Sequence, residues 1–356
     1  MHQYRILITS AAGPAGVNFI RSLKHAEQNI FILGVDTNPL HLPWISNPED
    51  PSSQVDIARV VPRCDNKKYL PTLNRLIKTY QISLVYAQSD TEVGFLSENR
   101  KKLKAPVILP SPRTVRICQD KMLSGKIWHS SGLPIAKTIK ITNDKSIDLA
   151  EKEFGYPYWL RSSRGAGGQG STRVDNKLTA TSWLQYWQAR QVDWTFIAQE
   201  FLPGPIIAFQ SVWNRGQLIT SQARERIEYL YPYLAPSGIT GTPVIARTIH
   251  NDKVNKMATR AIQAIDKKAT GAFCVDLRLN QNNIPIPTEI NVGRFFTTSF
   301  FFTKAGINMP LLLIKIGHKE RIPAQRKYNA VPADLYWCRH IDCPWTLRKK
   351  SELAIS

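Results

Sequence analysis

The sequence predicts a mixed α/β and α+β protein that begins with a parallel sheet and continues with a largely antiparallel region. Over residues 1–111, strand patterns and helix patterns alternate, as they do in a doubly wound sheet. After residue 111, several strand patterns follow one another without a helix between them, which favours antiparallel pairing. The chain has 356 residues, which is too long for one ordinary core and predicts two or three packed subdomains.

The first region opens with an apolar run that is typical of a strand buried on both faces of a sheet. A stretch rich in proline, asparagine and serine, Asn38–Ser53, predicts a loop. The predicted elements are, in order, strand Tyr4–Ser10, helix Pro14–Lys24, strand Ile30–Val35, helix Tyr69–Tyr80, strand Ile82–Gln88, helix Thr91–Leu103 and strand Val107–Leu109.

The second region contains more strands than helices, and the turn residues Asn280–Asn283 join its last two strands. Its predicted elements are helices Thr114–Cys118 and Lys121–His129, strand Pro134–Ile141, helix Ile147–Phe154, strands Tyr158–Arg161, Ser171–Val174, Phe196–Gln199, Ile206–Trp213, Leu218–Arg226 and Val244–Ile249, helix Lys253–Lys267, and strands Ala272–Leu279 and Ile286–Glu289. We expect a Rossmann-like domain over 1–111, a small subdomain over 112–200, a larger one over 201–345 and a tail over 346–356.

Composition and charge are those of a globular protein that attracts anions. Hydrophobic residues make up 43% of the chain, charged residues 21%, and the net charge is +20. There is no RNA-binding aromatic motif, zinc finger or run of five like charges, which argues against a nucleic-acid partner. The longest apolar run, Met309–Ile316, is far shorter than the roughly 20 residues that span a bilayer. With no secretory pattern at the N-terminus, we expect a cytoplasmic protein.

The five cysteines are scattered and odd in number, which disfavours a disulfide framework. Cys338, His340 and Cys343 lie close together, but no further ligand pair completes a tetrahedral zinc site. We therefore expect no zinc here, and we interpret the segment as a strand whose small cysteines pack inward.

A first glycine loop, Ala11–Gly16, lies between a predicted strand and a predicted helix, with Asp36 about 20 positions further on. This is the context of a dinucleotide-binding fingerprint, and it favours an NAD-dependent oxidoreductase as one alternative. However, Ala11 replaces the first glycine, and Pro14 removes a backbone N–H that a pyrophosphate would use. A glycine that merely fits helix against strand is the simpler interpretation.

A second glycine loop, Gly165–Gly170, lies between two predicted strands, and no helix follows it. A hairpin so rich in glycine has few side chains to pack, but its backbone N–H groups can lie on phosphate oxygens. The polar residues just before it add further donors and charge. The candidate phosphate-binding residues of this loop are Ser163, Gly165, Gly167, Gly168, Gln169 and Gly170.

Three oxygen-bearing side chains lie on the strands of the last predicted hairpin. Asp276 lies in one strand, and Glu289 and Asn291 lie two positions apart at the end of the other, so that they point to the same face. Two carboxylates and an amide oxygen are ligands that Mg²⁺ accepts together with nucleotide phosphates. The pattern predicts a magnesium site.

Together these residues resemble the ATP-grasp superfamily, most of all the ATP-binding half-units of carbamoyl phosphate synthetase and related carboxylate-amine ligases. The resemblance runs from about Tyr4 to His318. It implies an ATP-grasp fold preceded by a Rossmann-like (pre-ATP-grasp) domain that binds no dinucleotide. It also implies ATP and Mg²⁺, with two ions, as cofactors.

The resemblance assigns roles to individual residues. Lys121 matches the first nucleotide-contacting lysine, and Arg161 stands where most members have a second lysine and the carbamoyl phosphate synthetase type has arginine. Gly165–Gly170 resembles the mobile loop that closes over the β- and γ-phosphates. Asp276, Glu289 and Asn291 match the magnesium ligands. The residues that match the adenine-reading segment are Gln199, Glu200, Phe201 and Leu202.

Two departures from the family pattern concern the ribose and the acyl phosphate. The glutamate that usually follows "LPG" and binds the ribose is absent from Pro205–Ile207. The arginine of "EINPR" arrives one position late, as Arg294. Arg294 is therefore one candidate for stabilising the acyl phosphate, with Arg224, Arg226 and Arg278 as competitors.

The resemblance implies an ATP- and Mg²⁺-dependent ligase that activates a carboxylate as an acyl phosphate and couples it to an amine or another nucleophile. Besides the oxidoreductase, the missing ribose glutamate leaves a non-catalytic nucleotide-binding regulatory module as an alternative. The expected partners are small carboxylates and amines, with no membrane, and a homo-oligomer is left open.

Overall fold

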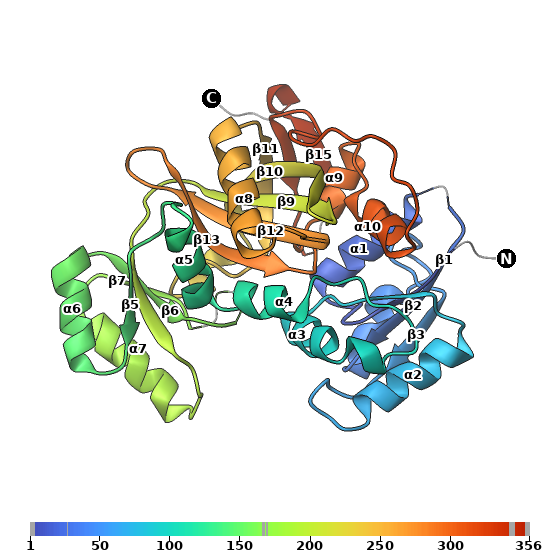
Figure 1. The fold of residues 1–356 in the computed structure, drawn as a ribbon, viewed down its shortest axis with the longest axis horizontal. Coiled ribbons are helices and arrows are strands. Elements are labelled where there is room, and N and C mark those ends of the chain that lie inside the picture. Colours follow the sequence, from blue (N-terminus) through green and yellow to red (C-terminus); the bar gives the residue numbers. More distant parts are fainter. Residues whose placement is uncertain (1–3, 27, 166–167, 169, 342–345, 353–356) are drawn as a thin grey trace.

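The computed structural model describes residues 4–26, 28–165, 168, 170–341 and 346–352, and Figure 1 shows its arrangement. Three sheets form the framework. A parallel four-stranded sheet comes first in the chain and lies at the right of Figure 1, a small antiparallel sheet forms a separate lobe at the left, and a seven-stranded antiparallel sheet lies at the upper centre. None of the helices in these ranges is long and apolar enough to cross a lipid bilayer.

The N-terminal sheet is parallel, has the order β3-β2-β1-β4, and is covered on both faces. Leu7 and Leu33 pack with one layer of helices, whereas Ile6 and Ile32 pack with the other. This alternation is the period of a strand that is buried on both sides. The strands are β1 (Tyr4–Ile8), β2 (Ile30–Asp36), β3 (Ile57–Val60) and β4 (Leu84–Tyr86), and the helices are α1 (Pro14–Lys24), α2 (Tyr69–Thr79) and α3 (Asp90–Glu98).

The structure corrects two details of this region. The segment Val107–Leu109 forms no strand; Val107 makes only an isolated bridge with Val85, and β3 is the fourth strand instead. The predicted loop also contains a short 3₁₀ helix, η1 (Pro39–Ile45), which begins where the Asn38 side chain accepts a hydrogen bond from the backbone of Leu40.

Gly16 fits α1 tightly against the end of β1, and this leads to a stability prediction. A Cβ atom at Gly16 would lie 2.4 Å from the carbonyl oxygen of Ala11 and 2.6 Å from that of Ser10. We expect Gly16→Ala to lower the free energy of unfolding by about 3 kcal/mol, because backbone must shift to make room. Urea unfolding measures this, with Gly13→Ala as the control.

At Gly13 the nearest atom to an added Cβ is 3.5 Å away. The control should therefore lose no more than about 1 kcal/mol, which is the effect of a less favourable N-cap residue. Equal losses for the two variants would contradict the packing role of Gly16.

The small lobe has the strand order β5-β8-β6-β7, with helices α6 and α7 packed on the sheet. Helix α7 was not predicted, although Asn176 caps its start and Ala180, Leu184 and Trp187 form an apolar face at helical spacing. The elements are β5 (Thr138–Ile141), α6 (Asp144–Phe154), β6 (Tyr158–Ser162), β7 (Thr172–Val174), α7 (Lys177–Ala189) and β8 (Phe196–Glu200).

The large sheet has the order β13-β12-β9-β10-β11-β14-β15, and every neighbouring pair is antiparallel. Its strands are β9 (Ile206–Asn214), β10 (Gln217–Tyr229), β11 (Pro243–Ile249), β12 (Gly271–Leu279), β13 (Pro285–Val292), β14 (Leu335–Cys338) and β15 (Thr346–Lys349). The accompanying helices are α4 (Pro112–Cys118), α5 (Lys121–Ser130), α8 (Asp252–Ile265), α9 (Phe300–Lys304) and α10 (Met309–Gly317).

The cores show which parts of the molecule belong together. Two large apolar clusters each contain residues of both the N-terminal sheet and the seven-stranded sheet. The small lobe has its own cluster. Among the described residues, a small apolar group of Ala136, Leu202 and Ile286 lies where the chain enters and leaves the small lobe. A cleft can therefore form between the small lobe and the rest of the molecule.

Candidate active site

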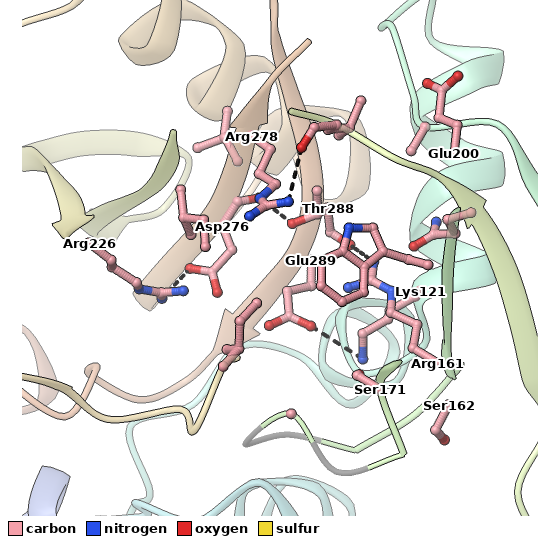
Figure 2. Close-up of a pocket in the computed structure, with 18 of the residues that line it drawn as sticks. Lys121, Arg161, Ser162, Ser171, Glu200, Arg226, Asp276, Arg278, Thr288 and Glu289 are labelled. Atoms are coloured by element: carbon pink, nitrogen blue, oxygen red, sulfur yellow. Dashed lines mark hydrogen bonds and ion pairs between the residues drawn. The ribbon is translucent and has the colours of Figure 1, made fainter. Parts of the chain in front are cut away.

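The cleft between the small lobe and the large sheet is a cavity of about 910 Å³, including its open mouth (Figure 2). Strands β6 and β8 of the small lobe and strands β10, β12 and β13 of the large sheet supply most of its walls. Its charged lining residues are Lys121, Arg161, Glu200, Arg226, Asp276, Arg278 and Glu289. Its apolar and aromatic lining residues include Ala136, Trp159, Leu202, Ile206, Tyr229, Ile239 and Leu277.

Lys121 connects the glycine loop with the acidic strand end. Asp120 caps the N-terminus of α5 and so directs the first helical residue, Lys121, into the cavity. The Nζ atom of Lys121 lies 3.3 Å from Oε2 of Glu289 and donates a hydrogen bond of 3.1 Å to the carbonyl of Gly165. Its side chain is only 8% exposed. The two motifs that the sequence places far apart therefore meet at one lysine.

Asp276 and Glu289 stand directly opposite each other on β12 and β13. Nη2 of Arg226 donates a hydrogen bond of 2.7 Å to Oδ1 of Asp276. Burial raises the pKa of Asp276 and the adjacent Glu289 carboxylate raises it further, against the opposing effect of Arg226. Burial also acts to raise the pKa of Glu289, but the positive charges of Lys121, Arg161 and Arg226 outweigh it and bring that pKa to about 2.

Arg161 extends from β6 across the cavity to the large sheet. Its Nη2 atom donates a hydrogen bond of 3.0 Å to the carbonyl of Thr288, and its buried Nε has no acceptor among the described residues. Burial lowers the pKa of Arg161, against the effect of the nearby Glu289 and Asp276 carboxylates. The guanidinium thus keeps unused hydrogen-bonding capacity beside the two carboxylates.

The second glycine loop lies over the cavity. Gly165 and Gly168 line it, both with positive φ, and a Cβ at Gly168 would lie 2.5 Å from the carbonyl of Ile239. Gly168 therefore contacts the backbone of the β10–β11 connection. Gly170 packs its Cα against the ring of Trp194, and Ser163 is buried beneath the loop. Gly167 and Gln169 lie outside the described residues.

The predicted adenine-reading segment borders the cavity at the end of β8. Gln199, Glu200 and Leu202 line it, whereas Phe201 stacks on Trp159 with ring centroids 6.0 Å apart. Trp159 itself lines the cavity and was not predicted. Because Trp159 lies two positions before Arg161 on β6, strand alternation could have placed both side chains on the same face.

Of the four candidate arginines, two line the cavity and two do not. Arg278 donates a hydrogen bond of 2.9 Å to the carbonyl of Leu202, and its guanidinium lies 5.6 Å from the ring centroid of Trp159. Arg226 holds Asp276 as described above. Arg224 is fully buried, with its guanidinium 3.8 Å from the ring centroid of Phe296 and a hydrogen bond to Thr298.

The environment of Arg224 lowers its pKa to about 9, chiefly through burial and the adjacent positive charge of Arg226.

Arg294 makes two hydrogen bonds of 2.7 and 2.8 Å to the carboxylate of Asp90 and a third of 2.7 Å to Oδ1 of Asn291. Asn291 lies beside a neighbouring cavity rather than in the cleft. Arg224, Arg294 and Asn291 therefore do not line the cleft, although the cavity beside Asn291 shares Lys121, Gly165 and Glu289 with it.

The donor set suits a hard divalent cation that also binds phosphate. Asp276 and Glu289 are like charges in direct cross-strand register, which a cation between them would relieve. Over the described ranges, no group of three histidine, cysteine, aspartate or glutamate side chains could hold a metal by itself. Cys343, the third member of the segment examined for zinc, lies outside those ranges.

The first glycine loop uses its backbone donors internally. The N–H of Ala11 donates to Val35, that of Gly13 donates to Ser10, and that of Ala12 donates to Oδ2 of Asp36 at 3.3 Å. Asp36 is the acidic residue that would bind a ribose in a dinucleotide site. Here the Asp36 carboxylate accepts a hydrogen bond from the N–H of Ala12 instead. Few N–H groups of the loop therefore remain free to bind a pyrophosphate.

The chain resembles ligases that use ATP. It is 23% identical over 197 residues to D-alanine–D-alanine ligase B of Clostridium perfringens. The aligned region covers 53% of this chain and 62% of that protein. It is 22% identical over 332 residues to the carbamoyl phosphate synthase large chain of Corynebacterium glutamicum. That aligned region covers 90% of this chain but only 28% of the relative. No protein-family model matches the chain.

A solved structure shows the same architecture over nearly the whole chain. The biotin carboxylase domain of 2-oxoglutarate carboxylase from Hydrogenobacter thermophilus, in complex with MgADP, ADP and bicarbonate, superposes with a TM-score of 0.69 at 16% identity. The match covers 95% of this chain and 75% of that one. The chain therefore has the ATP-grasp fold, and its sequence resembles the carboxylate-activating ligases of that superfamily.

Proposed function

We propose that this protein is an ATP- and Mg²⁺-dependent ligase that activates a carboxylate as an acyl phosphate and couples it to an amine. The observation that carries the proposal is the position of Lys121, whose ammonium group contacts both the glycine loop at Gly165 and the carboxylate of Glu289. A triphosphate in this cleft would meet cations, loop N–H groups and metal-binding carboxylates at the same end.

The residues of the chain would bind and orient the nucleotide. Lys121 and Arg161 would donate hydrogen bonds to phosphate oxygens and offset the negative charge that grows on them during transfer. The loop at Gly165 and Gly168 would cover the phosphates and exclude water. Asp276 and Glu289, with Asn291 as a candidate third ligand, would hold Mg²⁺, which when bound neutralises phosphate charge.

The reaction has two balanced steps. An oxygen of the substrate carboxylate bonds to the γ-phosphorus as the bond to the β-phosphate oxygen breaks, which releases ADP. The amine then bonds to the acyl carbon, inorganic phosphate leaves with the C–O bonding electrons, and the amine loses a proton. Neither step requires a covalent bond to the protein. Arg278 and Arg226 would face the bound substrates, and Arg224 and Arg294 remain candidates that act from outside the cleft.

The oxidoreductase alternative lacks support because Asp36 and the first glycine loop bind each other. The regulatory-module alternative keeps one argument, since Ile206 lines the cleft near the expected ribose position and offers no carboxylate. Turnover decides between a ligase and a module.

The test is ADP release from ATP in the presence of Mg²⁺ and a panel of small carboxylates and amines. We expect release that depends on both Mg²⁺ and the carboxylate, and no saturable binding of NADH. ATP binding without turnover across the panel would favour the regulatory module, and saturable NADH binding would revive the oxidoreductase.

We further propose that the chain divides after residues 111, 200 and 345. In support, the strands of the first two sheets each lie within one segment. The tail adds β15 to the third sheet, so the division after residue 345 marks no boundary between sheets. We propose cytoplasmic action on small molecules, in line with the D-alanine ligases that the chain resembles.

A further inference from the structure

A second cavity of about 980 Å³ adjoins the cleft, and its ligand is not specified by the proposed function. It is a groove between α3 and α4. One face of α3, including Asp90, Gly94 and Glu98, forms one wall, and one face of α4, including Arg116, forms the other. Gly94 has no side chain to fill the groove.

The inner end of this groove opens at the phosphate-binding end of the cleft. Lys121, Gly165 and Glu289 line both cavities. If the cleft binds a triphosphate as proposed above, the terminal phosphate lies at this shared wall. A molecule in the groove would then have one end beside the phosphate that is transferred.

The charges along the groove are of two kinds. At the inner end they are paired: Asp90 with Arg294, Lys121 with Glu289, and Arg164 with Asp120. Further out, Arg116 on α4 and Glu98 on α3 are exposed and make no ion pair or hydrogen bond among the described residues. The outer groove thus offers one free cation and one free anion on facing helices.

We propose that the groove binds an amino dicarboxylic acid of the aspartate or glutamate type as the carboxylate substrate. Its α-carboxylate would pair with Arg116 and its α-ammonium with Glu98, and its side-chain carboxylate would reach the inner end. Gln119, one helical turn or about 5 Å along α4 from Arg116, is hydrogen-bonded to Asp90 at that inner end. Glu98 lies eight residues from Asp90, about 12 Å along α3, and its side chain leans back toward the N-terminus of the helix and so toward the inner end.

The side-chain carboxylate is the group that would be phosphorylated. One of its oxygens bonds to the γ-phosphorus, the bond to the β-phosphate oxygen breaks, and ADP leaves. The α-carboxylate and α-ammonium are held further out, by Arg116 and Glu98, and take no part. Recognition of both charges would distinguish such a substrate from simple carboxylates and simple amines.

Calorimetric titration in the presence of Mg²⁺ and a non-hydrolysable ATP analogue tests the proposal. The probes are L-aspartate, L-glutamate, glutarate, which lacks the ammonium, and 4-aminobutyrate, which lacks the α-carboxylate. We expect Arg116→Ala to weaken binding of the better amino acid by roughly ten- to a hundredfold, the value of a charge-assisted hydrogen bond, and to leave 4-aminobutyrate unaffected. Glu98→Gln should weaken the amino acid but not glutarate.

Arg113→Ala is the matched control, because Arg113 is an exposed arginine on the same helix that does not line the groove. Equal effects of the Arg113 and Arg116 variants would overturn this inference, and so would the lack of saturable binding of either amino acid. If the ATP analogue still binds in those experiments, the ligase proposal remains. If the ATP analogue itself fails to bind, the proposed function fails, and this inference fails with it.

Discussion

Replacing Glu289 with glutamine is expected to reduce ADP release by about a thousandfold, the upper range for the loss of one electrostatic group in a site. Lys121 and Arg161 keep the pKa of Glu289 at about 2, with burial acting in the opposite direction, so this side chain is an anion at neutral pH. An amide of the same shape removes that charge between the cations and beside Asp276. ADP release measured at saturating ATP and Mg²⁺ gives the result directly.

The matched control for this variant is Glu228→Gln, an identical chemical change at an exposed position on β10 outside the cleft. We expect the control to retain full activity, and both variants to keep the circular dichroism spectrum of the parent. Normal ADP release by Glu289→Gln would remove the acidic strand end from the catalytic scheme.

Replacing Arg161 with methionine is expected to lower kcat/KM for ATP by about a hundredfold, in the range of a lost electrostatic contact to the transition state. Methionine fills much of the same space but leaves the phosphates without this cation. Arg161→Lys should recover part of the activity, because lysine restores the charge without the two-pronged hydrogen bonding. Initial rates over a range of ATP concentrations separate kcat from KM.

Arg173→Met serves as the control, since Arg173 stands opposite Trp159 on the neighbouring strand but does not line the cleft. Its guanidinium pairs with Asp175, with both side chains about half exposed, and lies 5.3 Å from the ring centroid of Phe201. If Arg161→Lys is no more active than Arg161→Met, the positive charge at position 161 does not account for the loss of kcat/KM. Equal losses at positions 161 and 173 would point to disturbance of the small lobe.

Local patterns in the sequence predict much of the fold. The helix over Pro14–Lys24 is found with the predicted bounds, and the alternation of strands and helices gives the parallel sheet. The failures have physical causes. Strand β3 lies at the sheet edge and carries Arg59, two half-buried apolar residues and the exposed Val60, so its apolar pattern is weak. Helix α9 contains Phe300–Phe302, and aromatic residues favour strands when only propensity is considered.

The candidate site was predictable where a motif lies within a few residues, and less so where distant segments meet. The glycine loop and the acidic hairpin are local patterns. The pairing of Arg294 with Asp90 joins residues 204 positions apart, and no pattern near either residue indicates it. The guanidinium of Arg224 packs on Phe296, which lies in the connection between β13 and α9, far from Arg224 in the sequence. These side chains could be assigned only after the tertiary structure placed them.

The separate core of the small lobe has a mechanical consequence. The chain enters the lobe near Ala136 and leaves it near Leu202, and both residues pack on Ile286 of β13. Among the described residues the core of the lobe is separate from the two large apolar clusters, which would let the lobe move as a body about these two crossings. A ligand held on both sides of the cleft would restrict such motion, and part of its binding free energy would be offset by the entropy lost. Substitutions at the crossings would then change nucleotide affinity without touching the nucleotide.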